Sequence, residues 1–167
     1  NIAENLMIVD VLRNDISRVS KKGSGEVTEL AKIKSYKNVH HLVSTIKGLL
    51  SEKLDAIDLL FATLPGGSIT GAPKIRAMEI ISELENNRRG VYCGAIGFIS
   101  FSKDSDFNIP IRTLTIADDT ISINCGGGIV SDSNAESEYQ ESIDKIENIL
   151  KENRKKIIKQ SSNVNQK

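Results

Sequence analysis

Three glutamates and a lysine carry side chains that could build a site for a hard cation. In the predicted helix that follows Ser133, Glu138, Glu141 and Lys145 lie on one face, apart from the apolar stripe. Carboxylate oxygens are ligands that Mg2+ prefers, and Glu4 of the first predicted helix could supply another. Charged helix faces are more often only solvated, and a Glu–Lys pair one turn apart stabilises an exposed helix. From these residues alone, a solvated face is the favoured interpretation and a magnesium site is the alternative.

Two glycine-rich segments are candidate anion-binding loops. Gly126, Gly127 and Gly128 follow a predicted strand and precede a predicted helix. Glycines let backbone N–H groups converge on an anion because no Cβ obstructs the approach. Residues 66–68, Gly-Gly-Ser, lie just before another predicted helix and add a hydroxyl group. The alternative interpretation of each segment is a flexible turn.

Arg112 is a candidate for binding a carboxylate. In a predicted strand over Ile109–Ala117, alternation places it on the same face as Leu114 and Ile116. Such an arginine either extends to solvent at an edge or is buried with an anionic partner. Its planar fork suits a carboxylate, but the pattern leaves the two interpretations open.

His40 and His41 are the two histidines of the chain. They lie in the segment Asn38–Leu50, whose apolar spacing predicts a helix. Either histidine is a structural hydrogen-bonding residue or an acid–base group that works near neutral pH. Adjacent residues do not share a helix face, so the two do not form a metal-binding pair.

The elements that position these residues are predicted from periodicity and turn signals. Helices, a run of strands connected by short turns, and a final helix predict one α+β domain over residues 1–160, an antiparallel sheet with packed helices. Residues 161–167 are expected to form a disordered tail. Ser133 and Glu136 have the spacing of a capping box. The predicted helices are Ile2–Val19, Asn38–Leu50, Ala56–Leu64, Pro73–Glu85 and a last one from near Ser133, and the predicted strands are Val91–Phe101, Ile109–Ala117 and Thr120–Asn124.

The composition argues against several classes of partner. Among 167 residues, 22 are Lys or Arg and 22 are Asp or Glu, so net charge gives no attraction to nucleic acid or to an anionic membrane. No apolar run reaches the roughly 20 residues that span a bilayer. Two cysteines without CxxC spacing are expected to be structural thiols in a reducing cytoplasm. The chain opens on Asn1 directly in helical periodicity, which we interpret as a fragment or a processed product.

Several segments, taken in order, resemble the signatures of the chorismate-binding enzyme family. This family includes enzymes that form anthranilate, 4-amino-4-deoxychorismate, isochorismate and salicylate. The segment Gly-Gly-Ser-Ile-Thr-Gly-Ala-Pro-Lys is similar to the branch that forms 4-amino-4-deoxychorismate. The resemblance implies the C-terminal portion of the family fold, without its N-terminal half. The matching segments are Ala3–Asp10, Leu12–Asp15, Val39–Ser44, Pro65–Lys74, Ile111–Leu114, Gly126–Val130 and Glu138–Glu141.

The resemblance implies a metal site in the family's position. Glu4 and Glu141 match the magnesium carboxylates, with Glu138 beside them, and the metal would hold the ring carboxylate of chorismate. Lys145 matches a catalytic lysine near that end of the substrate. With the resemblance, the charged face is interpreted as functional.

The resemblance also implies the substrate contacts. His41 matches the histidine near the hydroxyl that leaves from C4, and Ser68 matches a hydroxyl that contacts the substrate. Tyr92 matches an aromatic residue on the substrate side. Arg112 and the backbone of Gly126–Gly128 match the grip on the enolpyruvyl carboxylate.

The implied reaction joins chorismate and ammonia into 4-amino-4-deoxychorismate for folate and p-aminobenzoate biosynthesis. A partner glutamine amidotransferase would supply the ammonia. The branch carries a Pro-Ile-Lys-Gly-Thr motif whose lysine attacks C2, and this motif is absent from the sequence. We therefore expect the chain alone to be inactive. The alternatives are anthranilate formation in tryptophan biosynthesis and an inactive binding or assembly fragment, whose strand edges could cause self-association.

Overall fold

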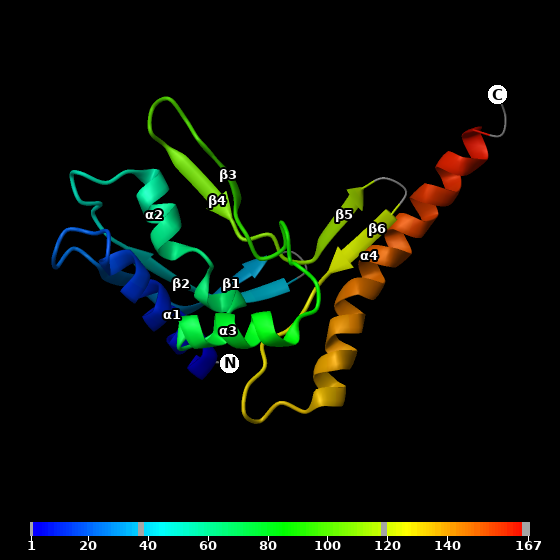
Figure 1. Cartoon of the computed structure of the whole chain (residues 1–167), viewed down its shortest axis with the longest axis horizontal. Coiled ribbons are helices and arrows are strands. Elements are labelled where there is room, and N and C mark those ends of the chain that lie inside the picture. Colours follow the sequence, from blue (N-terminus) through cyan, green and yellow to red (C-terminus); the bar gives the residue numbers. More distant parts are fainter. Residues whose placement is uncertain (1, 37–38, 118–119, 165–167) are drawn as a thin grey trace. The chain divides into compact units, whose positions relative to one another are not determined.

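The computed structural model describes residues 2–36, 39–117 and 120–164. It divides into two compact units, Asn1–Ile109 and Pro110–Lys167. The single domain over residues 1–160 stays a prediction. Helices and small antiparallel sheets make up both units, which confirms the predicted α+β class (Figure 1). The first unit contains α1 (Ile2–Ser17), β1 (Glu26–Tyr36), β2 (Val39–Lys47), α2 (Ala56–Thr63), the 3-10 helix η1 (Gly67–Ile69), α3 (Lys74–Leu84), β3 (Ile96–Ile99) and β4 (Ser105–Asn108). The second unit contains β5 (Thr113–Ala117), β6 (Thr120–Asn124) and α4 (Ala135–Val164).

Helix α1 packs on a long antiparallel hairpin formed by β1 and β2. The predicted helix over Asn38–Leu50 is therefore wrong, because this segment is a strand paired with β1 from Tyr36 opposite Val39 to Glu26 opposite Lys47. Its apolar spacing fits a helix, but its β-branched residues also fit a pleated strand, and pairing with β1 decides between the two. The hairpin is irregular near Ala31, which has a positive φ of 48°.

The helices on either side of η1 begin and end as their sequences predict. Helix α2 starts after Asp55, which forms a reciprocal capping box with Asp58. Pro73 is the N-cap of α3, where its missing N–H costs no helical hydrogen bond. All four ends of these two helices lie within one residue of the predicted positions.

The predicted meander is wrong in its pairing. β3 pairs with β4, a strand that the sequence did not predict, and β5 pairs with β6, so the segments form separate two-stranded sheets. Gly97 lets the backbone of β4 approach closely, because a Cβ there would collide with Asp106 and Phe107. β5 and β6 confirm the predicted antiparallel pair within the second unit.

Arg112 lies before β5 and not within it. Its φ of 50° is in the left-handed region, and Pro110 lacks a backbone donor for a ladder, so the strand begins only at Thr113. The predicted alternation that placed Arg112 on a face with Leu114 is therefore wrong. Its side chain is exposed.

Helix α4 begins after a different cap from the predicted one. The Oδ1 atom of Asn134 accepts a hydrogen bond from the backbone N–H of Ser137 at 3.2 Å, while the hydroxyl of Ser133 donates to Glu138 at 2.6 Å. Asn134 thus takes the capping role predicted for Ser133. The helix continues to Val164, and residues 165–167 of the predicted tail lie outside the described residues. Across the described ranges, no helix is both long enough and apolar enough to cross a membrane.

Candidate active site

The turn that carries Ser68 is held by close packing against α1. Gly67 is buried, and a Cβ at this position would lie 2.7 Å from Cγ1 of Val11. Only a residue without a side chain lets the turn approach the helix so closely. The hydroxyl of Thr70 donates to the carbonyl of Gly66 at 2.9 Å and closes the turn from within. Ser68 itself stays exposed, so its hydroxyl is available to a ligand.

A buried ion pair fixes the other end of this segment. Asp15, in the last turns of α1, is only 3% exposed and forms an ion pair with Lys74, the first residue of α3. Arg18 donates to the same carboxylate at 2.9 Å and to the carbonyl of Ala62 at 2.5 Å. The carboxylate therefore connects α1 with the end of α2 and the start of α3. A buried charge is tolerated only when it is paired in this way.

Glu4 and His41 lie on elements that pack together. Glu4 is half-buried in the first turn of α1, and its neighbour Asn5 accepts a hydrogen bond from Ser44 of β2 at 2.6 Å. His41 is exposed on β2, with its ring edge-on to Tyr36 at 5.8 Å between centroids. In the described part of the chain, Glu4, His41 and Ser68 are not hydrogen-bonded to one another. Glu4 lies on α1 itself, and both β2, which carries His41, and η1, which carries Ser68, contact this helix.

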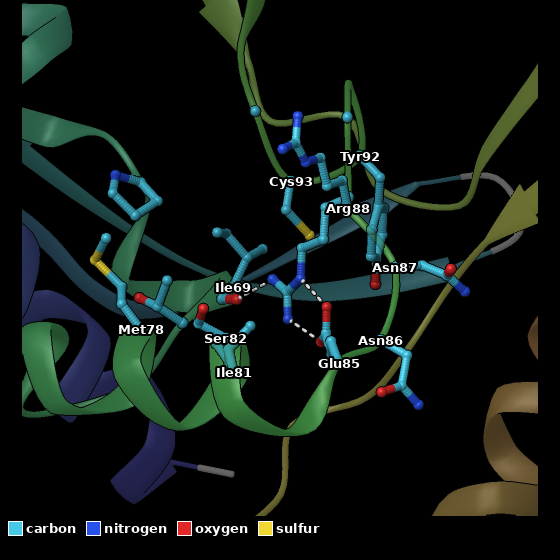
Figure 2. Close-up of a pocket in the computed structure, with 15 residues that line it drawn as sticks. Ile69, Met78, Ile81, Ser82, Glu85, Asn86, Asn87, Arg88, Tyr92 and Cys93 are labelled. Atoms are coloured by element: carbon cyan, nitrogen blue, oxygen red, sulfur yellow. Dashed lines mark hydrogen bonds and ion pairs between the residues drawn. The ribbon is translucent and has the colours of Figure 1, made fainter.

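Tyr92 borders a cavity of about 430 Å3 within the first unit (Figure 2). Ile69 and Thr70 of the Ser68 turn also line it, and Met78 and Ile81 of α3 contribute apolar surface. The cavity thus connects the turn that carries Ser68 with the segment that carries Tyr92.

In the second unit, the glycine segment lies against the charged face of α4. The Nζ atom of Lys145 donates to the carbonyl of Gly126 at 3.3 Å and forms an ion pair with Glu141 at 2.5 Å. A Cβ on Gly127 would lie 3.2 Å from Oε2 of Glu138. Five of the predicted positions therefore lie close together, and the absence of a side chain on Gly127 lets this loop approach Glu138 and Lys145.

Two cations also act on Cys125, which follows β6. Burial raises the pKa of its thiol, while the charges of Lys145 and Arg112 act in the opposite direction. Arg112 therefore lies near the same end of β6 as Lys145, although no ion pair connects it with a carboxylate in the described part of this unit. The Cys125 thiol donates to the carbonyl of Ser142 at 3.2 Å and so ties the strand to α4.

The chemistry of these side chains suits Mg2+. Glu138 and Glu141 supply hard oxygen donors one turn apart on α4. Among the described residues, no group of three or more carboxylate, histidine or cysteine side chains is gathered closely enough to hold a metal ion. The carboxylate oxygens are of the type that Mg2+ binds, and a magnesium site at these residues stays a prediction.

Sequence reasoning missed the residues that hold the candidates in place. Asp15, Lys74 and Arg89 are all charged, and composition alone places such residues at the surface. A signal was available for Lys74, because it follows a proline at a helix start, where a lysine has no favourable interaction with the helix dipole. Its position is explained by Asp15.

A family model described as chorismate binding enzyme matches residues 1–151. The chain is 58% identical over 150 residues to aminodeoxychorismate synthase component 1 of Escherichia coli K12, covering 90% of this chain and 33% of that protein. It is 49% identical over 149 residues to anthranilate synthase component 1 of Aquifex aeolicus, covering 89% of this chain and 30% of that protein. The chain thus spans about a third of the length of these relatives.

Solved structures show the same fold. Anthranilate synthase component I of Streptococcus pneumoniae superposes with a TM-score of 0.78 at 49% identity, covering 86% of this chain and 33% of that one. A structure titled as a 2,3-dihydroxybenzoate-specific isochorismate synthase of Bacillus anthracis also gives a TM-score of 0.78 at 23% identity, covering 90% and 40%, and supports the fold alone. The chain belongs to the chorismate-binding enzyme family. Within that family, its sequence is more similar to the enterobacterial aminodeoxychorismate synthase components, at 55% to 58% identity, than to the anthranilate synthase component of Aquifex aeolicus.

Proposed function

We propose that the protein to which these residues belong converts chorismate and ammonia to 4-amino-4-deoxychorismate, a precursor of p-aminobenzoate and folate. The observation that carries this proposal is the 58% identity to aminodeoxychorismate synthase component 1 across 90% of the chain. The arrangement of the glycine segment against Glu138, Glu141 and Lys145 supports it, because an anionic substrate needs backbone donors and a cation in one place.

The second unit would bind the carboxylate groups of chorismate. The N–H groups of Gly126–Gly128 and the guanidinium of Arg112 suit the enolpyruvyl carboxylate, since both donate to planar anions. Glu138 and Glu141, joined by Glu4, would hold a magnesium ion that binds the ring carboxylate and offsets its charge. Lys145 already contacts Glu141 and the carbonyl of Gly126, and it would hold both residues in position to bind the substrate.

The first unit would act at the ring hydroxyl. His41 is exposed, and a protonated imidazole at this position would donate a proton to the hydroxyl that leaves from C4. Ser68 would hydrogen-bond the substrate from the turn that α1 holds in place, and Tyr92 would line the substrate from the other side of the cavity. The protonated hydroxyl would leave C4 as water, and ammonia would form the new bond to C4 and lose one proton.

The proposal includes a partner and a compartment. A relative named component 1 implies a second component, and we propose a glutamine amidotransferase that delivers ammonia. The protein would work in the cytoplasm, where its two free thiols, Cys93 and Cys125, stay reduced. Anthranilate formation is the second candidate, because the 49% identity to anthranilate synthase component 1 covers nearly as much of the chain.

Product analysis tests the proposal. The complete polypeptide that carries these residues is incubated with chorismate, ammonium and magnesium, and the products are separated by chromatography with mass detection. Formation of 4-amino-4-deoxychorismate is expected, and His41→Asn should lower its rate about a hundredfold, in the range of acid–base catalysis. Formation of anthranilate with release of pyruvate would instead support the second candidate function. A parallel reaction with the 167 residues alone should consume no chorismate, and turnover there would show that these residues contain a complete site.

A further inference from the structure

Arg89 lies in the segment between α3 and β3, on the wall of the cavity that Tyr92 borders. Its side chain is 25% exposed, which is low for an arginine on a connecting segment. The sequence-based assignment gives this residue no role. Its side chain contacts both the turn that carries Ser68 and the ring of Tyr92.

The guanidinium of Arg89 is fully engaged on three sides. Its Nε and Nη2 atoms donate to the two carboxylate oxygens of Glu85 at 2.8 and 2.6 Å, which fixes the plane of the group. Its Nη1 atom donates to the carbonyl of Ile69 at 2.9 Å (dashed lines in Figure 2). Its central carbon also lies 5.7 Å from the centroid of the Tyr92 ring, within the range of a cation–π contact. The Glu85 pairing raises the pKa of Arg89 and keeps this cation charged.

These contacts connect Ser68 to Tyr92. Ile69 follows Ser68 within η1, so a donor on the Ile69 carbonyl fixes the orientation of the Ile69–Thr70 peptide, at the end of the short helix that carries Ser68. The cation–π contact restricts the Tyr92 ring at the same time. Glu85, at the end of α3, anchors the guanidinium to a helix. One planar group therefore sets the separation and orientation of two segments that border one cavity.

We infer that Arg89 is a positioning residue for the chorismate reaction, holding the Ser68 turn and the Tyr92 ring in their working geometry from outside the substrate site. The inference rests on the proposed function, because Ser68 and Tyr92 matter only if they meet chorismate. A lysine cannot replace Arg89, since an ammonium has no planar fork to serve Glu85 and Ile69 together. A small displacement of positioned groups is enough to slow an enzyme strongly.

The test is a double-mutant cycle in the complete polypeptide, with chorismate consumption and calorimetric chorismate binding as readouts. Arg89→Lys should lower kcat/KM for chorismate about tenfold, and should lower it much less in a Ser68→Ala background, because coupled residues are not additive. Arg76→Lys is the matched control, since Arg76 also pairs with glutamates but is exposed on α3 and does not line the cavity, and it should leave kcat/KM unchanged. Glu85→Gln serves if Arg89→Lys does not fold, and it should give a smaller loss that is again coupled to Ser68.

The outcomes separate the inference from the proposed function. Wild-type kcat/KM in Arg89→Lys, or in Glu85→Gln where that variant stands in, overturns the inference alone. The inference is also overturned if the double variant loses kcat/KM by the product of the two single losses. Such a result would mean that Arg89 acts independently of Ser68, as a purely structural residue would. A wild-type protein that neither binds nor consumes chorismate overturns the proposed function and the inference with it. Anthranilate as the product changes the function but leaves the comparison of Arg89 variants valid.

Discussion

Lys145 and Glu141 form an ion pair across one turn of α4, with Nζ of the lysine 2.5 Å from Oε1 of the carboxylate. The lysine side chain is 23% exposed and also donates to the carbonyl of Gly126 at 3.3 Å. A second pair of the same spacing, Glu147 with Lys151 at 2.6 Å, lies six residues further along the helix. The side chain of its lysine is 63% exposed. The contact with the glycine segment distinguishes the first pair from the second.

We predict that Glu141→Gln weakens magnesium dependence. The amide keeps the shape of the side chain but removes the charge that a hard divalent cation requires. The magnesium concentration for half-maximal activity should rise about tenfold, which corresponds to roughly 1.4 kcal/mol of binding. Magnesium titrations of the wild type and the variant measure this, with Glu147→Gln as the control for loss of an ordinary Glu–Lys pair. Identical titrations in wild type and Glu141→Gln would remove Glu141 from the metal site.

Gly127→Ala should impair chorismate binding without unfolding the protein. A Cβ at this position would lie 3.2 Å from Oε2 of Glu138 and 3.7 Å from Nζ of Lys145, so the carboxylate must shift. We expect KM for chorismate to rise several-fold, a cost of about 1 kcal/mol. Gly25→Ala is the matched control, because a Cβ there would meet nothing within 4 Å. Equal KM values for the two variants would show that the glycine segment is only a turn.

The sequence predicts the local elements better than their partners. α1, α2 and α3 begin within one residue of the predicted positions because caps and apolar spacing are local signals. β2 was misassigned because its apolar residues fit a helical spacing, and only the long-range pairing with β1 distinguishes a strand. The left-handed φ of Arg112 has no sequence signature in a residue that is not glycine.

In the candidate site, too, local signals could be predicted and contacts between distant segments could not. Type and spacing made the glycine segment and the charged face of α4 candidates, and the family resemblance favoured a functional role. The structure places Gly126 and Gly127 against Lys145 and Glu138 of this face. Arg89 was missed because its three contacts come from α3, η1 and its own segment, which no spacing rule connects. Asp15 and Lys74 were missed for the same reason, since a buried ion pair is visible only after the helices pack.

Asp15→Asn should destabilise the protein strongly. The substitution leaves Lys74 with 13% of its side chain exposed and without a carboxylate, and breaking a buried pair from one side costs about 3–5 kcal/mol. Urea titration of the wild type and the variant measures the free energy of unfolding. Asp10→Asn breaks an exposed pair with Arg13, and it should cost at most about 1 kcal/mol. The double variant Asp15→Asn with Lys74→Met should recover part of the loss, and no recovery would argue against an uncompensated charge as the cause.

Glu29 should make the β1–β2 hairpin sensitive to acid. The cations of Lys34 and Lys32 and the hydroxyl of Thr45 hold the pKa of its carboxyl at about 2, below the ordinary 4.5. The two lysine nitrogens lie 2.9 and 3.0 Å from its oxygens, and Thr45 lies opposite it on β2. A carboxyl with a lowered pKa binds fewer protons folded than unfolded, so it stabilises the fold above the unfolded pKa.

We therefore predict that the stability difference between wild type and Glu29→Gln is largest at neutral pH and declines as the pH falls from about 4.5 through the folded pKa of about 2, below which the glutamate is neutral like the glutamine. Urea titrations at a series of pH values from 7 to 2 measure it, with Glu26→Gln, an exposed glutamate of the same strand, as the control. Added salt should reduce the difference at pH 7, because the pairing is at the surface and is screened. A difference that stays constant from pH 7 to pH 2 would show that Glu29 stabilises the hairpin through its shape and not through its charge.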